Sequence, residues 1–236
     1  MKKRTIPVIL VLTMLLVVFS IANARAYSFS DFIDYLIDDL NDILVETNTE
    51  IDEVLANNNN EVHVILAQKN TEIHRISGDN PELNEILIET NSEVNEILAN
   101  HNNEIHEILA EGNTEINEIL VECYNEIHKI IAENDDLDKI DEILANTNNE
   151  IHAILEKQET EINEILGLSN TEIHTILEKQ ETKINEEFDY NREIDIILTE
   201  LNTEIDDTLA DSNTEIHEIL ANRNEEVHGI LEETPE

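Results

Sequence analysis

The sequence predicts an all-α protein whose long amphipathic helices fold back as an antiparallel helical bundle. Three observations lead to this fold class. A unit of eleven residues, with a period of twenty-two in places, recurs from residue 48 to residue 234. Each unit places its apolar residues on one side of a helix. At three points the repeat changes length beside turn-forming residues, which divides the chain after residue 26 into four stretches of similar length, as a bundle of long helices requires. The alternative is one extended right-handed coiled-coil rod, which an eleven-residue hydrophobic period also favours.

The repeating unit is clearest at residues 213–221, which read Asn-Thr-Glu-Ile-His-Glu-Ile-Leu-Ala. We number its positions one to eleven from the Asn. Position four is Ile or Val almost throughout, position seven is usually Ile, position eight is mostly Leu, and Glu fills position three. Eleven residues make three helical turns, about 98° per residue, so positions four, seven and eight form one apolar stripe. Position eleven faces the same stripe but holds polar residues such as Asn58, Lys69 and Arg223, which predicts a thin core.

The first 26 residues are expected to be a secretory signal peptide. They combine a basic start, an apolar run over residues 6–21 and the small-residue pattern Ala24-Arg25-Ala26, which predicts removal after Ala26. The alternative is an uncleaved membrane anchor, but the run is shorter than the about 20 residues that a spanning helix needs. No later segment is apolar enough to span a bilayer, so we expect a secreted chain with no membrane partner.

The remaining chain is expected to contain two parts. Residues 27–47 form an amphipathic N-terminal helix with apolar residues at helical spacing. Residues 48–234 form the eleven-residue helical repeat region, with breaks near residues 78–81, 134–137 and 189–192. Each break joins a unit of irregular length to residues that favour turns, so each is expected to end one helix.

The charge of the chain restricts its partners. Four of the thirteen basic residues lie in residues 1–26, so residues 27–236 carry nine bases against fifty-five acids, a net charge of −46. Nucleic acid is excluded as a partner because no basic surface can form. Carboxylates at this density attract Ca²⁺ or Mg²⁺, but no calcium-binding loop is present, so such binding would be diffuse.

The single cysteine, Cys123, excludes a disulfide within the chain. Since Cys123 occupies position eleven and faces the stripe, it could be a small packed residue. In a parallel dimer it could instead form an intermolecular disulfide.

Histidine at position five is the other group that could carry chemistry. Through the middle of the chain it alternates with Asn. Histidine beside Glu suits zinc or copper, which makes these residues weak metal candidates. However, histidines twenty-two residues apart on one helix are separated by about 33 Å, so solvated flanking residues are the simpler interpretation. A third hypothesis is a pH response, in which protonation at about pH 6 pairs histidine with a position-three Glu of a neighbouring helix. The candidates are His63, His74, His106, His128, His152, His174, His217 and His228.

The sequence therefore predicts a secreted, non-enzymatic, acidic helical-repeat protein that acts as a structural or interaction scaffold. Its partner would be itself or another protein, bound through the Ile/Leu stripe. The alternatives are a secreted effector or binding module, host-directed or immune-evading, and a diffuse divalent-cation binder. No catalytic motif and no cofactor motif is present. Over the repeat region alone, the spacing resembles the eleven-residue coiled-coil stalks of microbial surface proteins, which implies an extended structural role.

Overall fold

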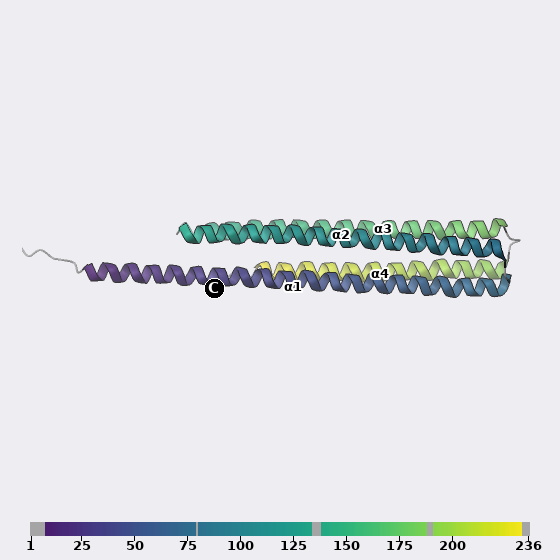
Figure 1. The fold of residues 1–236 in the computed structure, drawn as a ribbon, viewed down its shortest axis with the longest axis horizontal. Helices are drawn as coiled ribbons and strands as arrows, with labels where there is room; N and C mark the ends of the chain where they lie inside the picture. The colour runs from purple at the N-terminus through teal and green to yellow at the C-terminus, as the bar shows by residue number, and fades with distance from the viewer. Residues whose placement is uncertain (1–7, 79, 134–137, 188–190, 233–236) are drawn as a thin grey trace, which may run out of the picture.

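The computed structural model describes residues 8–78, 80–133, 138–187 and 191–232, without the side chains of residues 8–34, 138, 187 and 232. Four long helices make up this part of the chain, and it contains no strand. They are α1 (Val8–Ser77), α2 (Pro81–Glu133), α3 (Asp138–Glu187) and α4 (Arg192–Glu232) (Figure 1). The predicted all-α fold class is confirmed.

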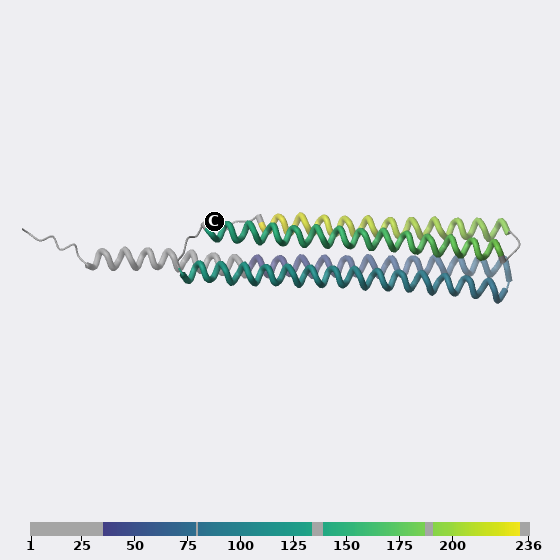
Figure 2. Tube along the Cα trace, turned by 90° about the horizontal axis from the view of Figure 1, so that it is seen from above, coloured from purple at the N-terminus to yellow at the C-terminus, as the bar shows by residue number. Residues whose placement is uncertain are grey.

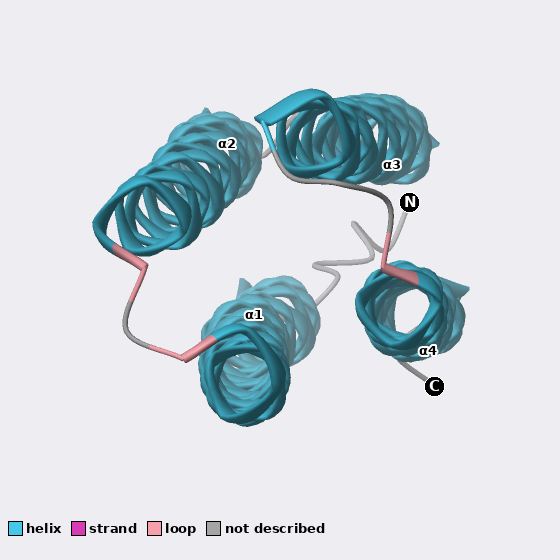
Figure 3. Ribbon diagram, turned by 90° about the vertical axis from the view of Figure 1, so that its right-hand side faces the viewer, coloured by secondary structure: helices cyan, strands magenta, loops and turns pink. Residues whose placement is uncertain are grey.

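The helices pack side by side within one chain. Figure 3, viewed along the long axis, shows them arranged in a ring in the order α1, α2, α3, α4. The closest packing is between α2 and α3 and between α1 and α4, whereas α1 with α2 and α3 with α4 are in looser contact. In Figure 2, α2 begins beside the end of α1, and α4 begins beside the end of α3. This bundle differs from the extended rod, in which the stripe would face other copies of the chain.

The core is built from positions four and eight of the unit. Most residues at these positions are buried on all four helices. Position four supplies one isoleucine from each helix to the middle of the bundle, and all four are fully buried: Ile51, Ile105, Ile162 and Ile216. Position seven lies at the margin of the core on α2, α3 and α4, where Ile108, Ile165 and Ile219 are partly buried, whereas Val54 of α1 is buried. The apolar stripe of each helix is thus covered by the other helices of the same chain.

Threonine at position two lies inside the helices without interrupting them. The hydroxyl groups of Thr49, Thr114 and Thr214 each donate a hydrogen bond to the carbonyl oxygen four residues earlier, at 2.8–2.9 Å. This bond satisfies the hydroxyl locally. The repeated Asn-Thr pair therefore does not start a new helix at every unit.

The connection between α1 and α2 has well-defined caps. Gly78 has a φ of 68° and donates its backbone N–H to the His74 carbonyl at 2.9 Å, which ends α1 in the left-handed conformation that glycine adopts freely. Asn80 Oδ1 accepts a hydrogen bond from the Glu82 backbone N–H at 3.0 Å, and Pro81 occupies the first position of α2. These residues lie within the break expected near 78–81.

The other two expected breaks lie partly outside the described residues. Near 134–137, α2 ends at Glu133 and α3 begins at Asp138. Near 189–192, α4 begins at Arg192, and Asn191 Oδ1 accepts a hydrogen bond from the Glu193 backbone N–H at 2.9 Å. Only three or four residues separate consecutive helices, so the relative positions of neighbouring helices are tightly restricted.

The N-terminal helix is continuous. α1 runs without a break through the part of the expected signal peptide that is described and through the expected helix at 27–47. Figure 1 shows its first turns extending beyond the ends of α2 and α3. Within the described part of the chain, no helix combines the length and the apolar character needed to cross a membrane.

Candidate functional site

The interior of the bundle contains polar layers at position eleven of the unit. Among the described residues, all buried polar residues except Asn70 occupy this position or, where no unit of eleven residues precedes, the equivalent place directly before a new unit. They are Thr47, Asn58, Lys69, Thr90, His101, Thr147, Gln158, Ser169, Gln180, Ser212 and Arg223. A buried polar group is costly unless it is hydrogen-bonded. Each of these residues therefore favours the arrangement in which a neighbouring helix supplies a hydrogen-bond partner.

The most connected layer joins α2, α3 and α4. Gln158 of α3 donates its side-chain N–H groups to the carbonyl oxygens of Ile108 and Leu109 on α2, at 3.1 and 3.3 Å. Its side-chain oxygen accepts a hydrogen bond from Arg223 of α4 at 2.9 Å. Gly112 of α2 makes room for this side chain, since a Cβ atom there would lie 2.0 Å from Gln158 Nε2. One glutamine therefore links three helices, and it fits because the facing residue is glycine.

Arg223 is a buried cation held by neutral acceptors. Only 2% of the residue is exposed, and it donates to Gln158 Oε1, to the Leu155 carbonyl and to Asn224 Oδ1. Asn224 in turn donates to a Glu159 carboxylate oxygen at 2.7 Å. Burial lowers the pKa of Arg223 to about 10, and attraction from Glu159 offsets this only in part. The guanidinium is still charged at neutral pH, where its burial is an electrostatic cost.

Lys69 occupies the corresponding position on α1. Its ammonium group contacts Glu200 at 3.1 Å and Glu204 at 2.9 Å, both on α4. Burial alone would lower the pKa of Lys69, but hydrogen bonds to Glu204 and Glu200 outweigh this effect and the pKa is raised. The contact therefore joins α1 to α4 through an ion pair at the edge of the core.

Two of these buried polar residues, His101 and Asn58, are less fully hydrogen-bonded than Gln158 and Arg223. His101 of α2 is 8% exposed, and its Nε2 lies 3.7 Å from a Glu172 carboxylate oxygen on α3. Its Nδ1 and the side-chain oxygen of Asn58 are buried without a hydrogen-bond partner. This histidine was not among the eight sequence candidates because it occupies position eleven rather than five.

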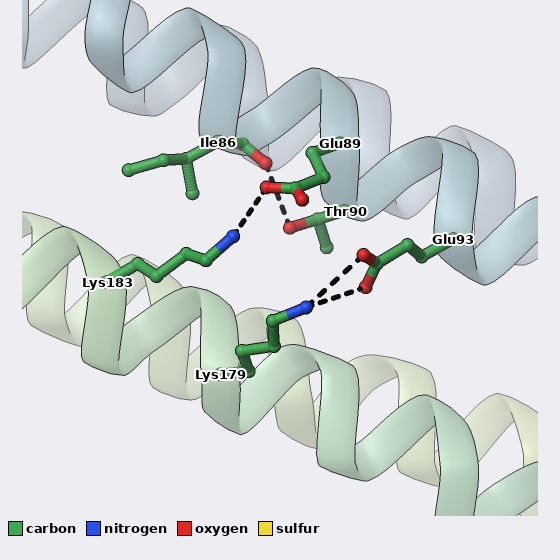
Figure 4. Close-up of polar contacts among 6 residues, drawn as sticks. All are labelled: Ile86, Glu89, Thr90, Glu93, Lys179 and Lys183. Atoms are coloured by element: carbon green, nitrogen blue, oxygen red, sulfur yellow. Dashed lines mark hydrogen bonds and ion pairs between the residues drawn. The ribbon is translucent and has the colours of Figure 1, made fainter.

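Ion pairs at the surface join α2 to α3. Lys183 contacts Glu89, and Lys179 lies 3.3 and 3.4 Å from the two carboxylate oxygens of Glu93 (Figure 4). A hydrogen bond from Lys183 lowers the pKa of Glu89. Lys183 pairs with Glu89 and Lys179 with Glu93, so the residue numbers rise along α2 where they fall along α3.

The eight predicted histidines do not gather into one site. Within the described part of the chain, no group of three or more His, Cys, Asp or Glu residues is placed to hold a metal ion. His63 and His74 are exposed on α1, and the ring of His128 packs on Tyr124 with centroids 4.3 Å apart. His217 Nδ1 lies 3.6 Å from Glu159 Oε1 across the α3–α4 interface.

The other four histidines meet position-five residues of a neighbouring helix. His106 Nδ1 lies 3.0 Å from Asp52, across the α1–α2 interface. His174 Nδ1 lies 3.5 Å from Asp206, across the α3–α4 interface. The hypothesis of pairing with position-three Glu is therefore wrong for these two contacts, because the facing carboxylate belongs to an aspartate at position five.

His152 and His228 form the remaining contact between position-five residues. His152 Nε2 lies 2.8 Å from His228 Nδ1, across the α3–α4 interface. Their ring centroids are 4.9 Å apart. One ring must donate a proton and the other accept it, so this hydrogen bond needs at least one neutral imidazole.

Cys123 lies inside the bundle. It is 3% exposed and packs with Ile127 of α2 and Ile140 of α3. Burial raises the pKa of its thiol, and a hydrogen bond with Thr147 offsets this in part. The intermolecular disulfide suggested by the sequence would therefore require the bundle to open.

No family model, curated protein or solved structure matched this chain.

Proposed function

We propose that this chain is an exported, non-enzymatic, antiparallel four-helix bundle built from eleven-residue units, and that it acts as a structural or interaction scaffold. The observation that carries the proposal is the separation of apolar and acidic residues. Positions four and eight are packed inside the chain, while most of the Glu side chains at position three are exposed. The result is an elongated bundle with an apolar interior and an acidic surface, about 80 Å long along the 53 residues of α2.

The scaffold would make its contacts through the outer surface. The Ile/Leu stripe, which the sequence suggested as a binding surface, is covered by the helices of the same chain. A partner could reach the stripe only if the bundle opened. The exposed face carries most of the fifty-five acids. Two copies of the chain would therefore need bridging cations to associate, and a different protein would need basic residues to bind this face.

The position of the expected cleavage site supports export. The contacts Asp52–His106 and Asn70–Asn91 set the relative position of α1 and α2. Glu133, the last residue of α2, is 27 residues beyond His106 and 42 beyond Asn91, so it lies opposite residues 25–28 of α1. Removal of residues 1–26 would therefore leave α1 about level with the end of α2. The described part of that segment, residues 8–26, is the part of α1 that extends beyond the bundle (Figure 1).

Export is tested by the mass of the chain released from a secreting host. We expect a mature protein that begins at Tyr27 and melts at the same temperature as a chain expressed directly from residue 27. A secreted chain that retains residues 1–26 would contradict this part of the proposal.

The scaffold function is tested by the association state of residues 27–236. Sedimentation and small-angle scattering should be measured with Ca²⁺ or Mg²⁺ and with NaCl at equal ionic strength. Elongated multimers formed with divalent cations support the scaffold. A monomer in all conditions would refute self-assembly.

The second candidate is a secreted binding module, host-directed or immune-evading. The observation that favours it is the burial of all four apolar stripes within one chain, which a monomer requires. A bundle that is monomeric at every concentration and divalent-cation level would support this alternative. Diffuse Ca²⁺ or Mg²⁺ binding is compatible with either function, and titration calorimetry measures it directly.

A further inference from the structure

His152 and His228 form a contact of a different kind from the other described position-five contacts between helices. His106 and His174 each face an aspartate, whereas here two imidazole rings meet. The two nitrogens that face each other, Nε2 and Nδ1, are 2.8 Å apart. His152 is half-buried and His228 is exposed, so solvent reaches the pair.

The geometry of this pair is close to that of two ligands on one metal ion. Zinc binds imidazole nitrogen at about 2.0–2.1 Å, and tetrahedral angles then place two such nitrogens about 3.3 Å apart. The observed separation of 2.8 Å is about half an ångström shorter. Rotation of the two imidazole rings would let a metal ion replace the hydrogen-bonding proton between them. Either imidazole nitrogen can serve as the ligand.

We propose that His152 and His228 bind one zinc ion between α3 and α4. The two imidazoles supply two ligands, and water can occupy the two remaining tetrahedral positions because the pair lies at the surface. The net charge of −42 for the whole chain raises the local concentration of divalent cations around the pair. Imidazole nitrogen then selects zinc over calcium and magnesium, which prefer oxygen ligands.

The proposed ion would join α3 to α4. These helices are in looser contact than α2 with α3 or α1 with α4. A ligand that binds only the folded state stabilises it by mass action. At a free zinc concentration of one hundred times Kd, we expect the melting temperature to rise by roughly 5–10 °C.

The test is titration of untagged residues 27–236 with ZnCl₂ at neutral pH, by calorimetry and by thermal melting with zinc or with chelator. His152→Ala and His228→Ala each remove one ligand, and His106→Ala is the matched control because it removes a position-five histidine from a His–Asp contact. We expect one zinc site per chain that binds more tightly than the diffuse acidic surface does. Either ligand variant should weaken it at least about tenfold, since even outer-shell substitutions cost 10–100-fold. The control should bind like the wild type.

Several outcomes would overturn the site. Zinc binding that is unchanged in His228→Ala, or weakened equally by His106→Ala, would assign the ion to the diffuse acidic surface. A zinc titration that matches the calcium titration in affinity and stoichiometry would do the same. The circular dichroism of each variant without metal confirms that the bundle has formed, so loss of zinc binding is not attributed to unfolding.

Discussion

The substitution Gly112→Ala separates helix propensity from packing. Glycine inside a helix costs about 1 kcal/mol relative to alanine, so propensity alone predicts that this change stabilises α2. The structure predicts the opposite. A Cβ atom at Gly112 would lie 2.0 Å from Gln158 Nε2, 2.3 Å from Cδ and 2.8 Å from Cγ, so the buried Gln158 side chain would have to move.

The expected loss exceeds the gain. Overpacking a core costs about 1–3 kcal/mol. Displacing Gln158 also breaks its hydrogen bond from Arg223, and bonds to charged groups contribute about 1.5–3 kcal/mol. Subtracting the helix gain of about 1 kcal/mol leaves a net destabilisation of roughly 1.5–5 kcal/mol. Urea unfolding followed by circular dichroism measures this difference.

The chain supplies a matched control in Gly167. It lies inside α3 and is exposed, and a Cβ atom there would meet nothing within 4 Å. Gly167→Ala should therefore stabilise the protein by about 0.5–1 kcal/mol. In the double variant Gly112→Ala/Gln158→Ala the steric cost should disappear, so the two substitutions should cost less together than the sum of their separate effects. If Gly112→Ala is as stable as Gly167→Ala, the proposed packing of Gln158 against α2 is wrong.

Three further predictions concern charge and burial. Hydrogen bonds to Glu204 and Glu200 raise the pKa of Lys69 above its ordinary value of 10.5, so its ion pairs stabilise the fold fully below that pH. The wild type should therefore lose stability relative to Lys69→Met in urea titrations as pH rises from 10.5 through the raised pKa, and a constant difference would contradict this. Cys123 should react with thiol reagents only as fast as the bundle opens, because its thiol is buried and its pKa raised, and labelling of the native protein as fast as in urea would refute its burial. The melting temperature should be higher in about 1 M NaCl than in about 0.01 M, since salt screens the repulsion within a chain of net charge −42, and a decrease would count against this account.

The helical character of this chain was predictable because it depends on local sequence. The spacing of Ile and Leu identifies the buried positions of each helix, and position four is buried in every described unit of eleven residues with a known exposure. Position eleven was also predicted to face the stripe, and Lys69 and Arg223 are buried there. The angular position of a residue around the helix axis is fixed by its place in the repeat. A residue at position eleven therefore faces the core whenever the apolar stripe is buried.

The contacts between helices were not predictable in the same way. Moving one helix by eleven residues past another, about 16.5 Å, brings stripe against stripe again with almost the same apolar contacts. The sequence therefore does not show that His152 meets His228 or that His106 meets Asp52. The useful signal was the variation at position eleven, where a glycine in one helix leaves space for the long side chain of Gln158 in the next.

Position eleven therefore provides the specificity that the regular stripe lacks. If α2 moved by one unit relative to α3, Gln158 would face His101 or Cys123, and neither leaves the space that Gly112 leaves. The connections of three or four residues oppose the same movement, since the chain could reach the new position only by unwinding helix. Both effects select one arrangement, one through packing and the other through the length of the chain.

The few basic residues of this chain are another feature that limits what its surface can bind. Only nine bases follow residue 26; Lys69 and Arg223 are buried in polar layers, and Lys179 and Lys183 join α2 to α3. Lys69 and Arg223 are thus out of reach of partners, and Lys179 and Lys183 are already paired with glutamates of α2. What remains outside is dominated by carboxylates, so an external partner has to bring positive charge, as a basic protein surface or as metal ions. Because bases are scarce, each one that bridges two helices favours one particular pairing of those helices. For the same reason the outer surface can attract only positively charged partners.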